Sequence, residues 1–251
     1  MFNACESLTK APELPATTLK SYCYEHMFDG CTSLIKAPAL PATTLADLCY
    51  YYMFSGCTSL IKAPALPATT LANQCYYYMF YYCKSLTNVP ALPATTLANQ
   101  CYQNMFQHCE RLTTLPRNLL PAKTLMEKCY SNMFDNCTSL TTIPNLPATT
   151  LTNSCYYYMF NGCTSLVETP EGWYLPAQTT DESSCRGMFY YCSKLQKMAV
   201  SYSGTITESH WKYFLSNVSR TGTFYYSKNQ TKENIQSIVP SGWTLVQSSS
   251  W

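Results

Sequence analysis

Charged side chains are scarce in this sequence. Lys, Arg, Asp and Glu make up 12% of the 251 residues, about half of the ~25% found in typical globular proteins. The net charge is +2, and Lys and Arg form no cluster. We therefore expect neither nucleic acid nor an anionic membrane surface as a partner. Tyr contributes 22 residues, so much of the surface must consist of Tyr, Thr, Ser and Asn.

Long apolar runs are also missing. No stretch approaches the ~18 consecutive apolar residues of a membrane span, and the N-terminus lacks the basic and apolar regions of a signal peptide. The sequence begins inside a repeat, at Met1-Phe2. We therefore expect a fragment or a processed form whose export signal lies upstream, with no membrane span in this chain.

Motifs of catalysis and of metal or cofactor binding are absent. His26, His108 and His210 belong to different units, so none is an evident partner for a thiol nucleophile. No glycine-rich phosphate loop, paired acid motif or close Cys pair typical of zinc sites is present. We predict a protein that is not an enzyme and that needs no metal or cofactor.

What the sequence does contain is a repeat. Successive Met-Phe pairs are separated by 26, 26, 26, 26, 28, 26 and 29 residues. A fixed period of this length is typical of a solenoid, in which each unit buries its apolar face only against its neighbours. The pairs begin at Met1, Met27, Met53, Met79, Met105, Met133, Met159 and Met188.

Each repeat carries two apolar patterns. The first, from Leu34 to Leu40, predicts a short strand whose hydrogen bonding is interrupted by Pro38. After the Pro-Ala-Thr-Thr-Leu corner, apolar residues at Leu45, Cys49 and Met53 fall at i, i+4 and i+8. We interpret this stripe as a short helix that ends near Met53.

The repeated phrase MFxxCxSLxxxPxLPATTLxxxCYxxMF closely resembles the BspA-like class of leucine-rich-repeat surface proteins, from Met1 to about Val200. The resemblance implies a cell-surface or secreted adhesion-type protein, and it offers no enzymatic residue. We predict an α/β repeat fold: a right-handed leucine-rich-repeat solenoid of about 7–8 coils, each pairing a short parallel strand with a short helix.

The regular period fails after residue 200, so we divide the chain into a solenoid, 1–200, and a C-terminal capping segment, 201–251. Met198–Val200 is expected to be the last strand of the solenoid. Within the cap we predict a helix over Thr207–Val218 and strands over Gly222–Ser227 and Trp243–Gln247. This small α+β piece would close the exposed end of the core; an independent binding module is the alternative.

Fifteen cysteines follow the repeat in two rows. Periodicity alone produces this pairing, and free cysteine is a good small buried hydrophobe, so we favour two stacks of reduced thiols over seven disulfides. One row is Cys5, Cys31, Cys57, Cys83, Cys109, Cys137, Cys163 and Cys192, and the other is Cys23, Cys49, Cys75, Cys101, Cys129, Cys155 and Cys185.

Two enlarged corners, Thr114–Pro121 and Glu168–Pro176, supply the first candidate contact site. Insertions in repeat proteins map to loops on one face, often the binding face. Two coils separate these corners, which places them roughly 10 Å apart. The candidate contact residues are Trp173, Tyr174, Arg117 and Asn118. Alternatively, Trp173 folds back to cover a gap left by Asp181.

Two surface rows are further candidates. Lys10, Lys36 and Lys62 stack in the first three coils, either as a solvated edge or as a recognition site for an acidic glycan or protein. Tyrosine gives large contact area at low entropic cost, but ring stacking between coils explains a tyrosine row equally well. That row is Tyr24, Tyr50, Tyr76, Tyr102, Tyr130 and Tyr156, backed by Tyr51, Tyr77 and Tyr157.

These features together predict a non-catalytic extracellular protein, monomeric, that binds a host or cell-surface protein or glycan. A structural spacer that holds another domain away from the cell is the main alternative. A carbohydrate-binding module using Trp173 and the tyrosine row is the third.

Overall fold

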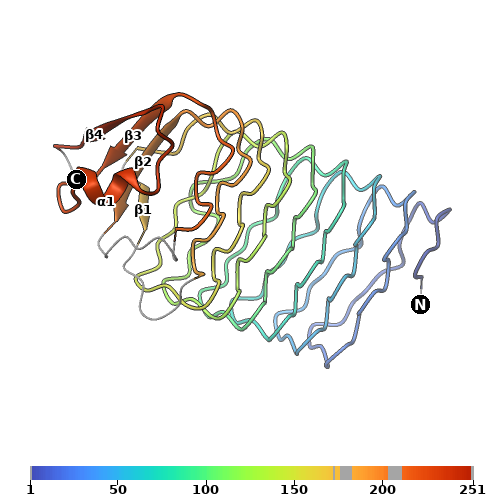
Figure 1. Cartoon of the computed structure of the whole chain (residues 1–251). Helices are drawn as coiled ribbons and strands as arrows, with labels where there is room; N and C mark the ends of the chain where they lie inside the picture. Colours follow the sequence, from blue (N-terminus) through green and yellow to red (C-terminus); the bar gives the residue numbers. More distant parts are fainter. Residues whose placement is uncertain (1, 172, 176–182, 203–210, 250–251) are drawn as a thin grey trace.

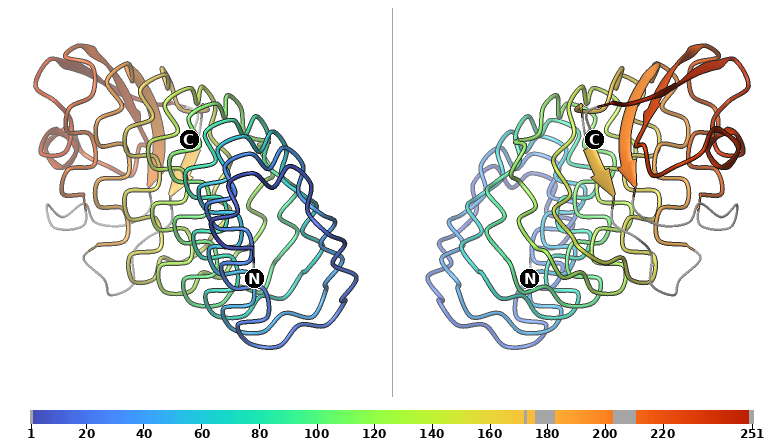
Figure 2. Two further views of the ribbon diagram at one scale, coloured as in Figure 1. Left: turned by 90° about the vertical axis from the view of Figure 1, so that its right-hand side faces the viewer. Right: turned by 90° about the vertical axis from the view of Figure 1, so that its left-hand side faces the viewer.

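The computed structural model describes residues 2–171, 173–175, 183–202 and 211–249 as one elongated stack of coils. The N-terminal coils lie at one end and the only regular elements of the described residues lie toward the other (Figure 1, Figure 2). Those elements are β1 (Trp173–Leu175), β2 (Lys197–Tyr202), β3 (Gly222–Tyr226), α1 (Lys232–Gln236) and β4 (Trp243–Gln247). A repeat solenoid is thereby confirmed, whereas its handedness and its number of coils stay predictions.

The strand side of the stack is parallel, as expected. At the C-terminal end, β1, β2, β3 and β4 pair in that order, each parallel to the next. Toward the N-terminus the strand shrinks to single parallel bridges, such as Lys36 with Lys62. Proline follows closely in each of these coils and cannot donate to a ladder, which limits the pairing to one residue.

The prediction of a short helix in every repeat is wrong. The place of that helix is taken by a chain of tight turns in which every fourth residue has a positive φ, for example Leu48 (60°), Tyr52 (52°) and Gly56 (68°). Left-handed residues cannot belong to an α-helix. The i, i+4, i+8 stripe therefore reflects a four-residue turn repeat, and Met53 shares its inward side with Cys57.

We call each such run of turns a turn segment. Hydrogen bonds between the turn segments of successive coils form a regular ladder, the turn ladder. Within one segment, alternate N–H groups bond three residues back, as in Met53 N to Tyr50 O (3.1 Å). The N–H groups between them bond to the next coil, as in Tyr50 N to Cys75 O (3.0 Å) and Phe54 N to Met79 O (2.9 Å). All these inter-coil donors point toward the C-terminus, and the acceptors face the N-terminus.

The interior consists of columns of identical residues. Phe28, Phe54, Phe80, Phe106, Phe134 and Phe160 are fully buried, and their neighbouring rings lie 5.5 to 5.7 Å apart and nearly parallel. Leucine columns, including Leu34, Leu60 and Leu86, fill the strand side. The predicted inward positions are therefore confirmed, and each coil buries its core only against its two neighbours.

Beyond residue 200 the strand predictions are confirmed and the helix prediction is not. β2, β3 and β4 cover the three predicted strands. The predicted helix lies partly outside the described residues, and its described part, from Trp211 to Val218, continues the turn ladder with positive φ at Tyr213 and Asn217. The sequence analysis missed α1, which is capped by Thr231 and buries Ile235.

Candidate functional site

The three lysines of the predicted row lie side by side. Lys10 is bridged to Lys36, and Lys36 to Lys62, and all three are exposed. Parallel neighbours of this kind are separated by about 4.8 Å, a distance at which like charges repel. Among the described residues, none of these ammonium groups forms an ion pair. The row is thus a concentration of unbalanced positive charge in an otherwise nearly neutral molecule.

Apolar surface flanks the lysine row. Ile35 and Ile61 are 52% and 45% exposed and border a hollow of about 340 Å³ together with Lys36 and Lys62. A second hollow of about 400 Å³ runs between the first two coils along Lys10, Lys36 and their alanine and proline neighbours, with Glu13 as its one acidic residue. We call Lys10, Lys36, Lys62, Ile35 and Ile61 the basic ridge. It combines charge with exposed aliphatic side chains, as protein-binding surfaces do.

The two enlarged corners do approach one another. Arg117 and Asn118 are exposed on a turn, and Arg117 lines a groove of about 300 Å³ together with Thr142, Glu168 and Pro170. The groove therefore spans three neighbouring coils, from the first insertion to the second. Opposite charges, on Arg117 and Glu168, flank this corner groove.

Trp173 must be removed from the set of contact residues. Its side chain is 2% exposed, packs edge-on against Phe189 at 5.7 Å between ring centres, and donates from Nε1 to Pro144 O at 3.1 Å. The alternative, that Trp173 folds back into the stack, describes its position; Asp181 lies outside the described residues. Tyr174 points the other way in β1 and is 42% exposed.

The tyrosine row is internal. Tyr50, Tyr76, Tyr102, Tyr130 and Tyr156 are each 1% exposed, and consecutive rings stack at 5.6 to 6.0 Å. Stacking between coils, rather than recognition, therefore explains this row. Tyr51 and Tyr77 beside it are half-buried and stack at 5.2 Å, so an aromatic surface is exposed only partly.

The cysteine rows are thiols inside the stack. In the turn row every Sγ from Cys31 onward donates to the phenylalanine carbonyl of the preceding coil, as in Cys57 to Phe28 O (3.1 Å) and Cys83 to Phe54 O (3.1 Å). Burial raises the pKa of Cys101 in the other row to about 12, so this thiol stays protonated at neutral pH. Protonated buried thiols are poor nucleophiles. Thirteen are buried, and the exceptions are Cys5 and Cys23.

A buried polar cluster lies beside the phenylalanine column, and sequence reasoning missed it. Asp135 is 5% exposed and accepts hydrogen bonds from Gln107 Nε2 (2.6 Å), Asn136 Nδ2 (2.8 Å) and Asn161 Nδ2 (2.8 Å). Burial nevertheless raises the pKa of this carboxyl group. The signal in the sequence was the run of Gln107, Asp135 and Asn161 at one repeat position, with Tyr81 and Tyr190 in the coils on either side.

Stacked coils, columns of identical core residues and an extended face of parallel bridges define the class of protein: a repeat scaffold of the leucine-rich type. Comparison with protein families then specifies it. The BspA type leucine rich repeat region matches residues 1–113 and 123–237, with 6 copies. The chain belongs to this family, whose repeats are generally non-catalytic scaffolds for protein interaction.

The comparisons with curated proteins and with solved structures gave no match. In the described ranges, no helix is both long and apolar enough to cross a membrane. No group of three or more His, Cys, Asp or Glu side chains among those residues is placed to hold a metal ion.

Proposed function

We propose that this protein is exported to a bacterial cell surface or secreted, and that it binds a host or cell-surface macromolecule through its basic ridge. Proteins of this family are typically surface-associated or secreted in bacteria. The observation that carries the proposal is the row of Lys10, Lys36 and Lys62, which forms no ion pair among the described residues and lies beside exposed Ile35 and Ile61.

An acidic patch on a protein is the partner that fits best. A negative surface would relieve the repulsion within the lysine row, while the isoleucines supply apolar contact area. The two enlarged corners are the second candidate site, because Arg117 lines the corner groove and Asn118 and Tyr174 are exposed on the same corners. We further propose that 201–251 caps the solenoid 1–200 and takes no part in this contact.

The test is a binding screen of the purified chain against host matrix proteins and glycans. The Lys36→Glu/Lys62→Glu variant should lose at least tenfold in affinity for any hit, and raised salt should weaken the wild-type interaction. Lys123→Glu/Lys228→Glu, which makes the same charge change at two other exposed lysines, is the matched control and should bind normally.

Other outcomes would redirect the assignment. Loss of binding in Arg117→Ala/Tyr174→Ala but not in the lysine variant would place the site at the enlarged corners. Binding to glycans without any protein partner would favour a carbohydrate module. No saturable binding to any member of the screen would favour a structural spacer.

A further inference from the structure

The turn ladder ends before the sheet does. Gly187, Phe189 and Tyr191 donate to Lys212 O (3.0 Å), Phe214 O (3.1 Å) and Ser216 O (3.0 Å) of the segment Trp211–Asn217. This is the last turn segment among the described residues, whereas β3 and β4 extend the sheet further along the axis. On the turn side, α1 and Ser237–Pro240 take the place between β3 and β4, and in the described ranges no backbone hydrogen bond joins them to Trp211–Asn217.

The donors that would bind a further turn segment are in place. Tyr213, Leu215 and Asn217 lie 26 residues after Gly187, Phe189 and Tyr191, and their N–H groups have no acceptor in the described ranges. The intervening amides are paired, Phe214 N with Trp211 O (2.9 Å) and Ser216 N with Tyr213 O (3.3 Å). Tyr213 and Asn217 keep the left-handed φ of the ladder, at 61° and 60°, so the donor row is already shaped.

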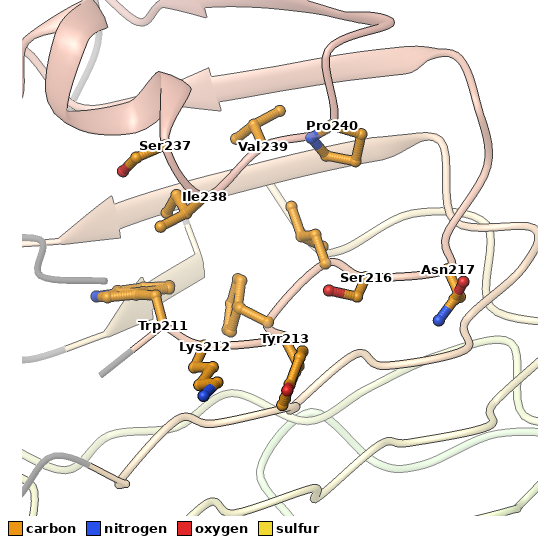
Figure 3. A pocket seen from close by; sticks show the side chains of 11 residues that line it. Trp211, Lys212, Tyr213, Ser216, Asn217, Ser237, Ile238, Val239 and Pro240 are labelled. Atoms are coloured by element: carbon orange, nitrogen blue, oxygen red, sulfur yellow. The ribbon is translucent and has the colours of Figure 1, made fainter. Parts of the chain in front are cut away.

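A pocket separates the last turn segment from the segment that follows α1 (Figure 3). It has a volume of about 420 Å³ and is lined on one side by Trp211–Asn217 and on the other by Ser237–Pro240. Trp211 is 2% exposed and packs against Tyr202 and Phe214, at 5.0 and 4.3 Å between ring centres, so it is a fixed part of the pocket wall. We call this pocket the end groove.

We propose that the end groove binds an extended peptide segment of a partner protein through the backbone carbonyls of that segment. Donors at alternate residues require acceptors at alternate residues, which a peptide in extended or turn-ladder conformation presents along one side. Each earlier junction of the solenoid uses this pairing. A second copy fits less well, because β4 and α1 project beyond the last turn segment and would meet a flat incoming coil (Figure 1).

The probe is a synthetic nonapeptide that copies Gln100–His108 with Cys101→Ser. In the chain this stretch accepts from the preceding coil through alternate carbonyls, including Cys101 O from Tyr76 N (3.0 Å) and Met105 O from Phe80 N (2.9 Å). Five of its nine residues are Gln, Asn or His, which keeps the peptide in solution. Binding at the end groove is independent of the basic ridge, so the lysine variants serve as controls that should bind the probe normally.

Amide hydrogen exchange measured by NMR reads the groove directly. In the free protein, Tyr213, Leu215 and Asn217 should exchange at least tenfold faster than the paired amides of Phe214 and Ser216. Saturating peptide should slow the first three and leave the other two unchanged. Equal protection of all five amides in the free protein, or no slowing by millimolar peptide, would overturn the proposal; so would protection accompanied by dimers in sedimentation, since a second copy would then occupy the groove.

Discussion

The phenylalanine column allows a quantitative test of how this solenoid is stabilised. Phe106 is fully buried and stacks on Phe80 at 5.5 Å and on Phe134 at 5.6 Å. Phe2 has the same place in its repeat, but it is only partly buried and stacks on Phe28 alone, at 5.6 Å. The two positions differ in the number of coils that contact the ring, which is the quantity under test.

Phe106→Ala should lower the free energy of unfolding by about 4–5 kcal/mol, at the upper end of buried Phe→Ala changes, because two stacked pairs of about 0.5–1.5 kcal/mol each are lost. Phe2→Ala should cost about 1–2 kcal/mol, since one pair and less buried area are lost. Urea unfolding followed by circular dichroism measures both values. Equal costs would refute the view that nearest-neighbour coil contacts hold the structure together.

The same variant tests cooperativity. Trp173, Trp211 and Trp243 are buried and all lie on the C-terminal side of Phe106, so tryptophan fluorescence reports the C-terminal half of the stack. In the wild type we expect fluorescence and circular dichroism to change together. In Phe106→Ala the weakened junction should separate the two transitions, with fluorescence changing at the higher urea concentration. Coincident transitions in the variant would mean that coupling extends beyond adjacent coils.

Three further predictions concern the thiols, the buried carboxyl group and the turns. Burial raises the pKa of Cys101 to about 12, so iodoacetamide at pH 8 should modify only the exposed thiols of the native protein and all fifteen thiols in urea. Mass spectrometry counts the adducts. Cysteines that stay unreactive in urea without reductant would reveal disulfides and contradict the prediction. The pKa of Asp135 is raised from 3.8 by burial, so the folded state binds this proton more tightly, and stability should fall as pH rises from about 3.8 through the higher folded pKa; urea midpoints of Asp135→Asn should lack this component. Gly162→Ala should lower the free energy of unfolding by about 1–2 kcal/mol because of its φ of 67°. It should lower it further because the new Cβ would lie 2.5 Å from the side-chain amide oxygen of Asn136 in the neighbouring coil. In Gly56→Ala the Cβ meets nothing closer than 3.5 Å, so its melting temperature should fall only by the backbone contribution.

The strand side and the core columns could be predicted from sequence because they depend on side chains alone. Leu34 and its equivalents recur at one position of every repeat and are buried in the structure. The turn side could not be predicted in the same way, because Leu45, Cys49 and Met53 satisfy both a helix and a four-residue turn repeat. The distinguishing sign was Cys57, which continues the four-residue spacing. In a helix, Cys57 would be rotated by about 120° from Leu45 and would leave the apolar face.

The positive φ values explain why that sign was easy to overlook. Glycine is the usual residue in this conformation, yet Leu48, Tyr52 and Gln74 adopt it here. Stacking and inter-coil hydrogen bonds offset the backbone cost, as for Tyr52, whose N–H bonds to Tyr77 O (3.0 Å) and whose ring stacks on Tyr78 at 4.6 Å. A tertiary contact therefore selects the local conformation, and such a contact is invisible until the coils are stacked.

Trp173 shows the same limit for the candidate sites. An insertion with Trp and Tyr resembles a contact surface, but alternation along β1 directs Trp173 inward and Tyr174 outward, and only the register of the strand decides which side is which. The lysine row needed no such decision, because residues at one position of successive repeats lie side by side in any solenoid. Rows are therefore predictable from the period, whereas single residues at irregular corners are not.

The polarity of the turn ladder is the feature furthest from sequence and the one with the largest functional consequence. Every inter-coil N–H of the turn ladder points toward the C-terminus, so the two ends of this ladder differ chemically: the first coil offers carbonyl oxygens, and the last turn segment offers the N–H groups of Tyr213, Leu215 and Asn217. Two N-terminal ends cannot pair through this ladder, since acceptors would face acceptors. Only a chain that brings carbonyl groups can complete the other end. The structure therefore restricts what the end groove binds through its backbone before any side chain is considered.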